Sequence, residues 1–191
     1  MKEAMGQYQS AIKDYEAYAD LIKSPRERLE ILFLTAELHR KIEQWSKAQE
    51  KYKEYVDSNP GNGENLVEAL YWVAYVFNRK GSSQSYSYED KLLAVQKRLG
   101  NSKGAKWASI VKLGRAKDTY NDFVEIKIPS NPEKQKKAVD DKVGMLNKLN
   151  KELNDVVKLN HHESIISSLN LLGEANEHMA NSILKSPIPK G

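Results

Sequence analysis

Apolar and aromatic side chains recur every three or four residues along most of this chain, which is the spacing of one face of an α-helix. In the first such segment they occupy positions 8, 11, 12, 15, 18, 19 and 22. The pattern predicts eight helices, over residues 6–23, 26–42, 45–58, 64–80, 88–99, 104–124, 133–159 and 161–185. Clusters of Gly, Pro, Asn and Ser separate these segments, and we expect residues 81–87 to form a polar loop. No pair of segments is typical of paired strands, so the sequence predicts an all-α protein with antiparallel neighbouring helices.

Two of the predicted helices have clear start signals. Ser24 can accept a hydrogen bond from a first-turn N–H group, and Pro25 suits the first helical position. Pro129 disfavours continuation of the sixth helix, and Pro132 can begin the seventh. We therefore expect helices to begin near residues 25 and 132.

A small residue flanked by aromatic residues recurs along the chain. Tyr8, Ala11, Tyr15 and Tyr18 align with Trp45, Ala48, Tyr52 and Tyr55. A small side chain lets two helix backbones approach closely, while the flanking rings fill the grooves beside it. We expect such contact points at Ala11 and Ala48 on second helices, and at Ala36, Ala74, Gly114 and Gly173 on first helices. Ala11 and Ala48 are 37 residues apart, Ala36 and Ala74 are 38 apart, and Ala74 and Gly114 are 40 apart. A period of this length indicates stacked helix pairs.

This arrangement resembles the tetratricopeptide repeat (TPR) family. The closest unit is residues 29–62, where Leu32, Thr35, Ala36 and His39 match the first helix and Trp45, Ala48, Tyr52, Tyr55 and Pro60 match the second. Leu70, Val73, Ala74, Phe77 and Gly81 match another first helix, and the match is degenerate further on. The resemblance implies a right-handed solenoid of about eight helices in antiparallel pairs. It divides the chain into repeats over 1–100 and degenerate helices with a C-terminal cap and a Pro-containing tail over 101–191.

The two ends of the chain add further expectations. The first hairpin lacks most of its first helix, so we expect further repeats upstream in a longer parent protein. The tail, with Pro187, Ile188 and Pro189, is similar to the C-terminal ends of TPR proteins attached to envelope-spanning, gliding-type machineries of deltaproteobacteria. That similarity implies a bacterial scaffold for gliding motility that is periplasmic or associated with the envelope. A cytoplasmic location is the alternative.

Composition excludes several functional classes. Hydrophobic residues make up 40% and charged residues 29% of the chain, as in a folded globular protein. The absence of cysteine excludes disulfides, thiolate zinc sites and cysteine nucleophiles. No segment approaches the roughly 18 consecutive apolar residues of a membrane-spanning helix.

Candidate catalytic and metal-binding residues are few. His161, His162 and Glu163 are consecutive, and neighbouring residues on a helix point about 100° apart, so they cannot easily share one ion. Glu174 and His178 share a face but need a third ligand from elsewhere. His39 occupies a packing position, and residues 100–106 lack the spacing of a phosphate-binding loop. We expect neither a metal nor another cofactor, and the sequence predicts a protein that is not an enzyme.

The TPR resemblance implies a concave surface lined by first helices. The residues expected to face this groove are Phe33, Leu34, Glu37, Arg40, Tyr71, Trp72, Tyr75, Asn78, Arg79 and Arg115. In one TPR subclass lysine and asparagine at such positions clamp a terminal carboxylate, whereas this chain has Phe33, Glu37, Tyr71 and Tyr75 there. Aromatic rings and arginines favour a peptide or a helix of another protein with apolar anchors. The alternative for each ring is that it only packs against neighbouring helices.

Two other functions compete with protein binding. The net charge is +4, and residues 103–158 carry 13 basic and 8 acidic side chains. That segment, with Lys134, Lys136 and Lys137, could serve as a basic adaptor for nucleic acid or another anionic polymer, although Asp140 and Asp141 interrupt the lysines. The stack could also be purely structural. Its last helix would then be a cap whose outer face carries the polar residues Asn170, Glu174, Glu177 and Asn181.

Overall fold

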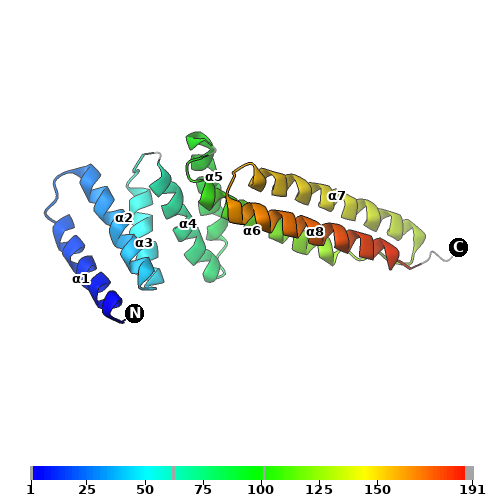
Figure 1. Cartoon of the computed structure of the whole chain (residues 1–191), viewed down its shortest axis with the longest axis horizontal. Helices are drawn as coiled ribbons and strands as arrows, with labels where there is room; N and C mark the ends of the chain where they lie inside the picture. The colour runs from blue at the N-terminus through cyan, green and yellow to red at the C-terminus, as the bar shows by residue number, and fades with distance from the viewer. Residues whose placement is uncertain (1, 62, 101, 188–191) are drawn as a thin grey trace. The chain divides into compact units, whose positions relative to one another are not determined.

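The computed structural model describes residues 2–61, 63–100 and 102–187, and these contain eight helices and no strand. The helices are α1 (Lys2–Ala19), α2 (Pro25–Lys41), α3 (Trp45–Asp57), α4 (Glu64–Arg79), α5 (Gln84–Leu99), α6 (Ala105–Glu125), α7 (Pro132–Val157) and α8 (His162–Leu184). Figure 1 labels all of these helices. The all-α prediction is confirmed over this part of the chain.

The chain divides into two compact units, Met1–Trp107 and Ala108–Gly191. Helices α1 to α5 and the first turn of α6 form the first unit. The remainder of α6, with α7 and α8, forms the second. The two units are built in different ways.

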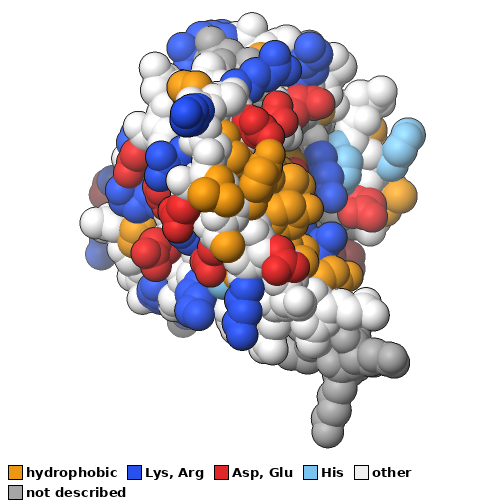
Figure 2. All heavy atoms as spheres, turned by 90° about the vertical axis from the view of Figure 1, so that its left-hand side faces the viewer, with side chains coloured by type: hydrophobic (Ala, Val, Ile, Leu, Met, Phe, Trp, Pro, Cys, Tyr) orange, Lys and Arg blue, Asp and Glu red, His pale blue; other side chains and the backbone are white. Residues whose placement is uncertain are grey.

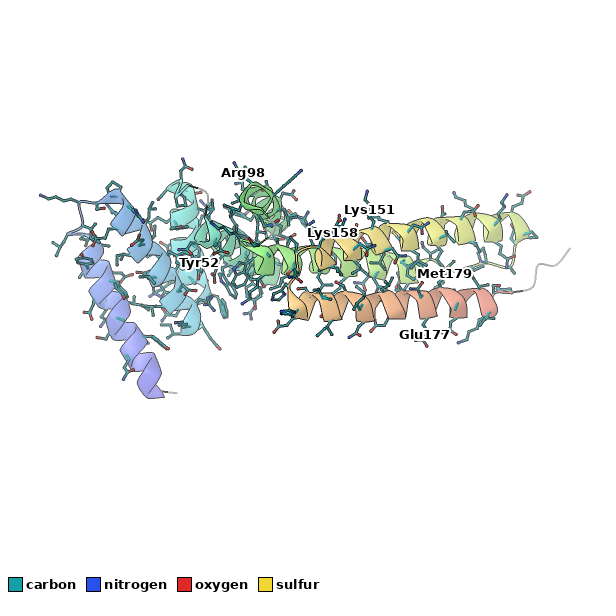
Figure 3. All side chains as sticks on the ribbon, turned by 45° about the horizontal axis from the view of Figure 1, so that its top comes forward. Tyr52, Arg98, Lys151, Lys158, Glu177 and Met179 are labelled. Atoms are coloured by element: carbon teal, nitrogen blue, oxygen red, sulfur yellow. The ribbon has the colours of Figure 1, made fainter. Side chains whose placement is uncertain are left out.

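In the first unit each helix packs against the next one in the chain, from α1 to α5, and successive helices alternate in direction (Figure 1). Small residues lie where α2, α3 and α4 meet: Ala36 is 0% exposed, Ala48 1% and Ala74 3%. The Tyr52 ring is also fully buried and lies 5.7 Å from Phe33 between centroids. Figure 3 shows Tyr52 among the helices of this unit. On the α1 side, hydrophobic side chains gather among charged ones (Figure 2).

Local hydrogen bonds explain where several helices begin. The Ser24 Oγ accepts from the Glu27 N–H at 3.4 Å, with Pro25 as the first residue of α2. In α7 the Asn131 Oδ1 accepts from the Lys134 N–H at 3.1 Å, ahead of which Pro132 begins the helix. Both predicted helix starts are confirmed.

The prediction of a polar loop over residues 81–87 is wrong in its second half, because α5 begins at Gln84. The Gln84 N–H donates to the Ser82 Oγ at 3.3 Å, and the Ser85 Oγ donates to the Ser82 carbonyl at 3.0 Å. Tyr88 stacks on Phe77 with ring centroids 5.5 Å apart. The Ser82 hydroxyl thus accepts from one N–H of the first turn, and Tyr88 contacts the Phe77 ring of α4 one turn further along.

The second unit is a three-helix bundle with one core. Its buried residues come from all three helices: Leu113, Ala116 and Phe123 from α6, Leu149, Leu153 and Val156 from α7, and Leu171, Ala175 and Met179 from α8. Figure 3 shows Met179 pointing into the bundle and Glu177 pointing away from it. Each helix therefore contributes one apolar face to a shared interior.

The prediction that Gly114 and Gly173 are close contact points between helices is wrong. Both glycines are exposed, and a Cβ atom built on either would meet nothing within 4 Å. In both helices a fully buried alanine lies two positions further along, at Ala116 and Ala175. Two positions turn a side chain by about 200°, so the glycines face outward.

A buried lysine connects the three helices of the bundle. Lys142 is 0% exposed, and its Nζ donates to the carbonyls of Phe123 and Ile126 at 2.8 and 3.0 Å. The same Nζ lies 3.1 Å from the His178 Nε2. Burial lowers the pKa of Lys142, and burial together with the nearby Lys142 charge lowers the pKa of His178. A neutral His178 accepting at Nε2 satisfies the third donor of the ammonium group.

Candidate functional site

Five aromatic side chains form a surface cluster in the first unit. This aromatic cluster consists of Trp45 from α3, Tyr71, Trp72 and Tyr75 from α4, and Trp107 from the first turn of α6. Its ring centroids lie 4.6 Å apart for Tyr71 and Trp107, 4.9 Å for Tyr71 and Trp72, and 5.4 Å for both Trp45–Tyr75 and Trp72–Trp107. Every ring is half-buried, so each keeps some surface in contact with solvent. The cluster contains all three tryptophans of the chain.

Helix α4 supplies the centre of the cluster because both sides of the helix are apolar. Leu70, Val73 and Ala74 face the core and are at most 3% exposed. Tyr71 and Tyr75, four residues apart, lie side by side at the surface, with ring centroids 6.2 Å apart. The run of apolar residues in α4 therefore serves two surfaces at once.

A glycine positions Trp107 against α4. Gly104 has φ +68°, and a Cβ atom there would lie 2.9 Å from the Val67 side chain, so only glycine fits without displacement. The Gly104 N–H donates to the Glu64 Oε1 at 3.0 Å. These contacts hold the start of α6 against the start of α4, which brings the Trp107 ring to Tyr71.

Three basic side chains lie over the rings. The Arg40 guanidinium carbon is 4.6 Å from the Trp72 ring centroid, and the Lys106 Nζ is 4.6 Å from that of Trp107. Arg79 lies between Trp45 and Tyr75, at 5.5 and 5.8 Å. Such cation–π contacts contribute about 0.5–1 kcal/mol each at exposed sites. They also give the cluster a basic edge.

Two carboxylates accompany the cluster. Glu37 accepts from Arg40 Nη2 at 2.8 Å and from the Tyr52 hydroxyl at 3.4 Å. Glu68 accepts from the Trp72 Nε1 at 3.1 Å, and burial raises the pKa of Glu68. Burial also raises the pKa of Tyr71, which stays protonated at neutral pH. These acceptors fix Arg40 and Trp72 in one orientation each.

The structure brings together half of the residues predicted to face a groove. Tyr71, Trp72 and Tyr75 belong to the cluster, and Arg40 and Arg79 lie over its rings. Glu37 is attached to it through Arg40, and Asn78 is exposed in the last turn of α4.

The other predicted residues lie elsewhere. Phe33 is only 7% exposed, and its ring lies 5.3 Å from that of Tyr55, so it forms part of the core between α2 and α3. Leu34 is 42% exposed on α2. Arg115 belongs to the second unit.

Sequence reasoning missed Trp45, Glu68, Lys106 and Trp107. The TPR resemblance places Trp45 at a packing position of its own repeat, and the helical spacing does not distinguish Trp107 from the other apolar positions of its helix. One signal could have found them: tryptophan is rare, and both residues lie in the first turn of a helix that follows a short turn. Only the fold shows that these two helix starts meet the same face of α4.

Other candidate chemical groups are engaged in structural contacts. Among residues 2–61, 63–100 and 102–187, no three His, Cys, Asp or Glu residues lie close enough to hold a metal ion. His161 Nδ1 lies 2.9 Å from the Ser164 Oγ, and the His39 Nδ1 lies 2.8 Å from the Gln44 Oε1. Lys134, Lys136 and Lys137 are exposed on α7, together with Glu133, Asp140 and Asp141 of the same helix.

Comparisons with known proteins leave the site to be judged from its geometry. No protein-family model matches this chain, and neither does any curated protein or any solved structure. None of the helices within the described residues has the length and apolar character needed to cross a bilayer. Residues 188–191 lie outside the described part, and with them the predicted tail residues Ile188 and Pro189.

Proposed function

We propose that this protein is a non-enzymatic scaffold that binds a peptide or a helix of another protein on its aromatic cluster. The observation that carries the proposal is the cluster itself, in which five rings pack on one another and still keep solvent-exposed surface. Tyrosine, tryptophan and arginine are the residues most enriched at energetically dominant positions of protein interfaces. All three types lie together here.

The packing of the rings favours binding because it limits their freedom before a partner arrives. Each ring contacts at least one other ring, and Glu68 holds the Trp72 indole through a hydrogen bond. Side chains that are already ordered lose little conformational entropy when a partner covers them. We therefore expect the cluster to accept apolar or aromatic anchors without rearrangement.

The basic edge defines the polar part of the partner. Arg79 and Lys106 lie over rings at the surface, and both are exposed. A partner carboxylate next to an apolar anchor could pair with Arg79 while the anchor covers the ring. The proposed ligand is therefore a peptide or a helix with apolar anchors flanked by acidic residues.

The proposal includes a TPR-like architecture within a larger bacterial envelope assembly. The successive antiparallel packing of α1 to α5 and the buried Ala36, Ala48 and Ala74 support the TPR-like part. The hydrophobic side chains on the α1 side would suit the packing of a preceding repeat (Figure 2). A periplasmic or envelope-associated location, including a role in gliding motility, rests on the resemblance of the tail.

A capture experiment tests the proposal. Wild-type protein and a Tyr71→Ala/Tyr75→Ala variant are immobilised and exposed to lysate of the source cell at low and moderate salt. Tyr86→Ala, which removes a 53% exposed ring from α5 of the same unit, is the matched control. Circular dichroism first establishes that all three proteins are equally helical.

We expect one protein to be captured by the wild type and by Tyr86→Ala at both salt concentrations, and to bind the double variant at least about tenfold more weakly. Equal recovery by all three proteins would contradict a binding role for the cluster. Capture that disappears with salt, and that depends on Lys134, Lys136 and Lys137, would instead favour the basic adaptor.

A further inference from the structure

One face of α8 carries apolar and small residues in contact with solvent. Ile166, Leu169, Gly173, Asn176, Ala180 and Ile183 follow one another at spacings of three and four, and all six are exposed. We call this set the α8 stripe. Ile166 is 61% exposed, Leu169 59% and Ile183 48%. Among the described residues nine large hydrophobic side chains are exposed, and four of them, these three and Leu184, lie on α8.

The buried core of the second unit includes none of the six stripe residues, and one of them, Ile183, also borders a hollow, with Ile128, Pro132 and Val139. Leu171, Ala175 and Met179 of α8 fill the bundle core on another face of the helix. The Asn176 Nδ2 donates back to the Leu172 carbonyl of its own helix at 2.8 Å. The cap prediction accounts for the neighbouring polar residues Asn170 and Glu177 but not for exposed isoleucine and leucine. A three-and-four spacing over 18 residues is the seam of a two-helix coiled coil.

We propose that α8 of a second copy of this chain packs antiparallel on the α8 stripe. The spacing is symmetric about the point between Glu174 and Ala175, so an antiparallel partner aligns the stripe with itself. Ile166 then lies opposite Ile183 of the second copy, Leu169 opposite Ala180, and Gly173 opposite Asn176. In two of these three pairs, Leu169 with Ala180 and Asn176 with Gly173, a larger side chain packs against a smaller one. Such pairing fills the interface without gaps.

A parallel pair would pack less well. It places Gly173 opposite Gly173 and Ala180 opposite Ala180, and leaves space beside both. Antiparallel helices also place the positive end of one macrodipole beside the negative end of the other. The helix is 23 residues long, so the contact would extend over roughly 34 Å.

The residues beside the stripe also favour the antiparallel arrangement. One flank carries Asn170 and Glu177, both exposed, and the other carries Ile165 and Leu172, both partly buried. In an antiparallel pair like flanks meet, so the Asn170 amide can donate to the Glu177 carboxylate of the second copy. In a parallel pair Glu177 would face the apolar flank and lose solvation without a partner.

The oligomeric state of the full chain tests the proposal. Sedimentation equilibrium over roughly 1–500 μM should show the mass rising from 21.8 kDa toward twice that value, since only three large side chains per chain support a weak dimer. Leu169→Glu should stay monomeric over the same range. Val143→Glu places the same charge at a 40% exposed position of α7 and should dimerise like the wild type.

The absence of cysteine allows the orientation to be tested by cross-linking. An equal mixture of Ile166→Cys and Ile183→Cys should form a mixed disulfide dimer, while neither variant should form one by itself. The two positions are about 25 Å apart along one helix, so an antiparallel pair cannot join a residue to its own copy.

Four results would overturn the proposal. They are a wild-type monomer at every concentration, a Leu169→Glu dimer, a loss of dimer in Val143→Glu equal to that in Leu169→Glu, and disulfide dimers of each cysteine variant on its own. Circular dichroism of the glutamate variants checks that each is as helical as the wild type. Because both sites are exposed, we expect no loss of helix in either.

Discussion

At the end of α6, the buried ammonium group of Lys142 donates hydrogen bonds to backbone carbonyls. Helix α6 ends at Glu125. Next to this end the Phe123 carbonyl accepts one long backbone bond, from the Ile126 N–H at 3.4 Å, and the Ile126 carbonyl lies just beyond the helix. The Lys142 Nζ donates to both, and His178 of α8 takes the third donor. One side chain therefore joins α6, α7 and α8 in a way that no apolar residue could reproduce.

Replacing Lys142 with methionine should destabilise the protein. The change keeps most of the side-chain volume but removes the charged donor from both carbonyls, of which, among the described residues, only that of Phe123 keeps a backbone partner, and we expect a cost of about 1–3 kcal/mol. Urea unfolding followed by circular dichroism measures the loss. Lys137→Met, at an exposed position of the same helix, is the control and should change stability by less than about 0.5 kcal/mol. Equal stability of the two variants would show that Lys142 is dispensable.

His178 should make stability fall on acidification. Its pKa in the folded protein is lowered from 6.5 by burial and by Lys142, so the unfolded chain binds the proton more readily. Stability contributed by the neutral imidazole is therefore complete above pH 6.5 and decreases as the pH falls below that value. The melting temperature measured between pH 7.5 and pH 5 should decrease. In the His178→Gln variant, whose side chain keeps an acceptor but cannot be protonated, the melting temperature should decrease less over this range. Identical pH profiles for the wild type and the variant would exclude His178 as the cause.

At the scale of the helix, the spacing of apolar residues predicts where each helix lies but not where every helix begins. The sequence predicts every helix because apolar residues recur with helical spacing over at least three turns in each. It misses the first turn of α5 because Ser82 and Ser85 form the same local bonds in a loop as at a helix start. In the folded protein the helix is formed and Tyr88 stacks on Phe77 of α4, a contact that spacing within residues 81–87 does not reveal.

Gly104 is the residue on which the placement of α6 depends, so Gly104→Ala should disturb both stability and the aromatic cluster. The methyl group would strain a backbone with φ +68° and would lie 2.9 Å from Val67. We expect a loss of about 1–3 kcal/mol and a red shift of tryptophan emission as Trp107 becomes more exposed. Gly100→Ala strains a similar φ of +88° where a Cβ atom meets nothing, and it should lose stability without the spectral change. The same emission spectrum for both variants would contradict this role of Gly104.

At the scale of the whole molecule, one repeating pattern continues across two kinds of packing. Small residues recur every 37 to 40 residues up to Gly114, but of these only Ala36, Ala48 and Ala74 are buried. Ala74 is buried where α4 meets its neighbours, whereas Gly114 faces outward from a three-helix bundle. A period in sequence predicts that helices recur, but it cannot predict which face each one buries.

In the candidate site, too, residues on one helix could be predicted from the sequence, whereas residues brought together by the fold could not. Tyr71, Trp72 and Tyr75 could be predicted because they lie on one helix and share a spacing. Trp45 and Trp107 could not, because their contacts with α4 link segments far apart in the chain. The repeat position of Phe33 predicts that it faces the groove, but its ring is buried against Tyr52 and Tyr55.

The gathering of Trp45, Trp72 and Trp107 in one unit gives the protein a built-in spectroscopic reporter. These are the three tryptophans of the chain, and the second unit contains none. Indole fluorescence therefore follows the first unit, while far-ultraviolet circular dichroism follows the helices of both. Unfolding curves that coincide for the two signals would indicate that the units unfold together, and curves that separate would give each unit its own stability. The same emission would respond when a partner covers the rings, with no label attached to either protein.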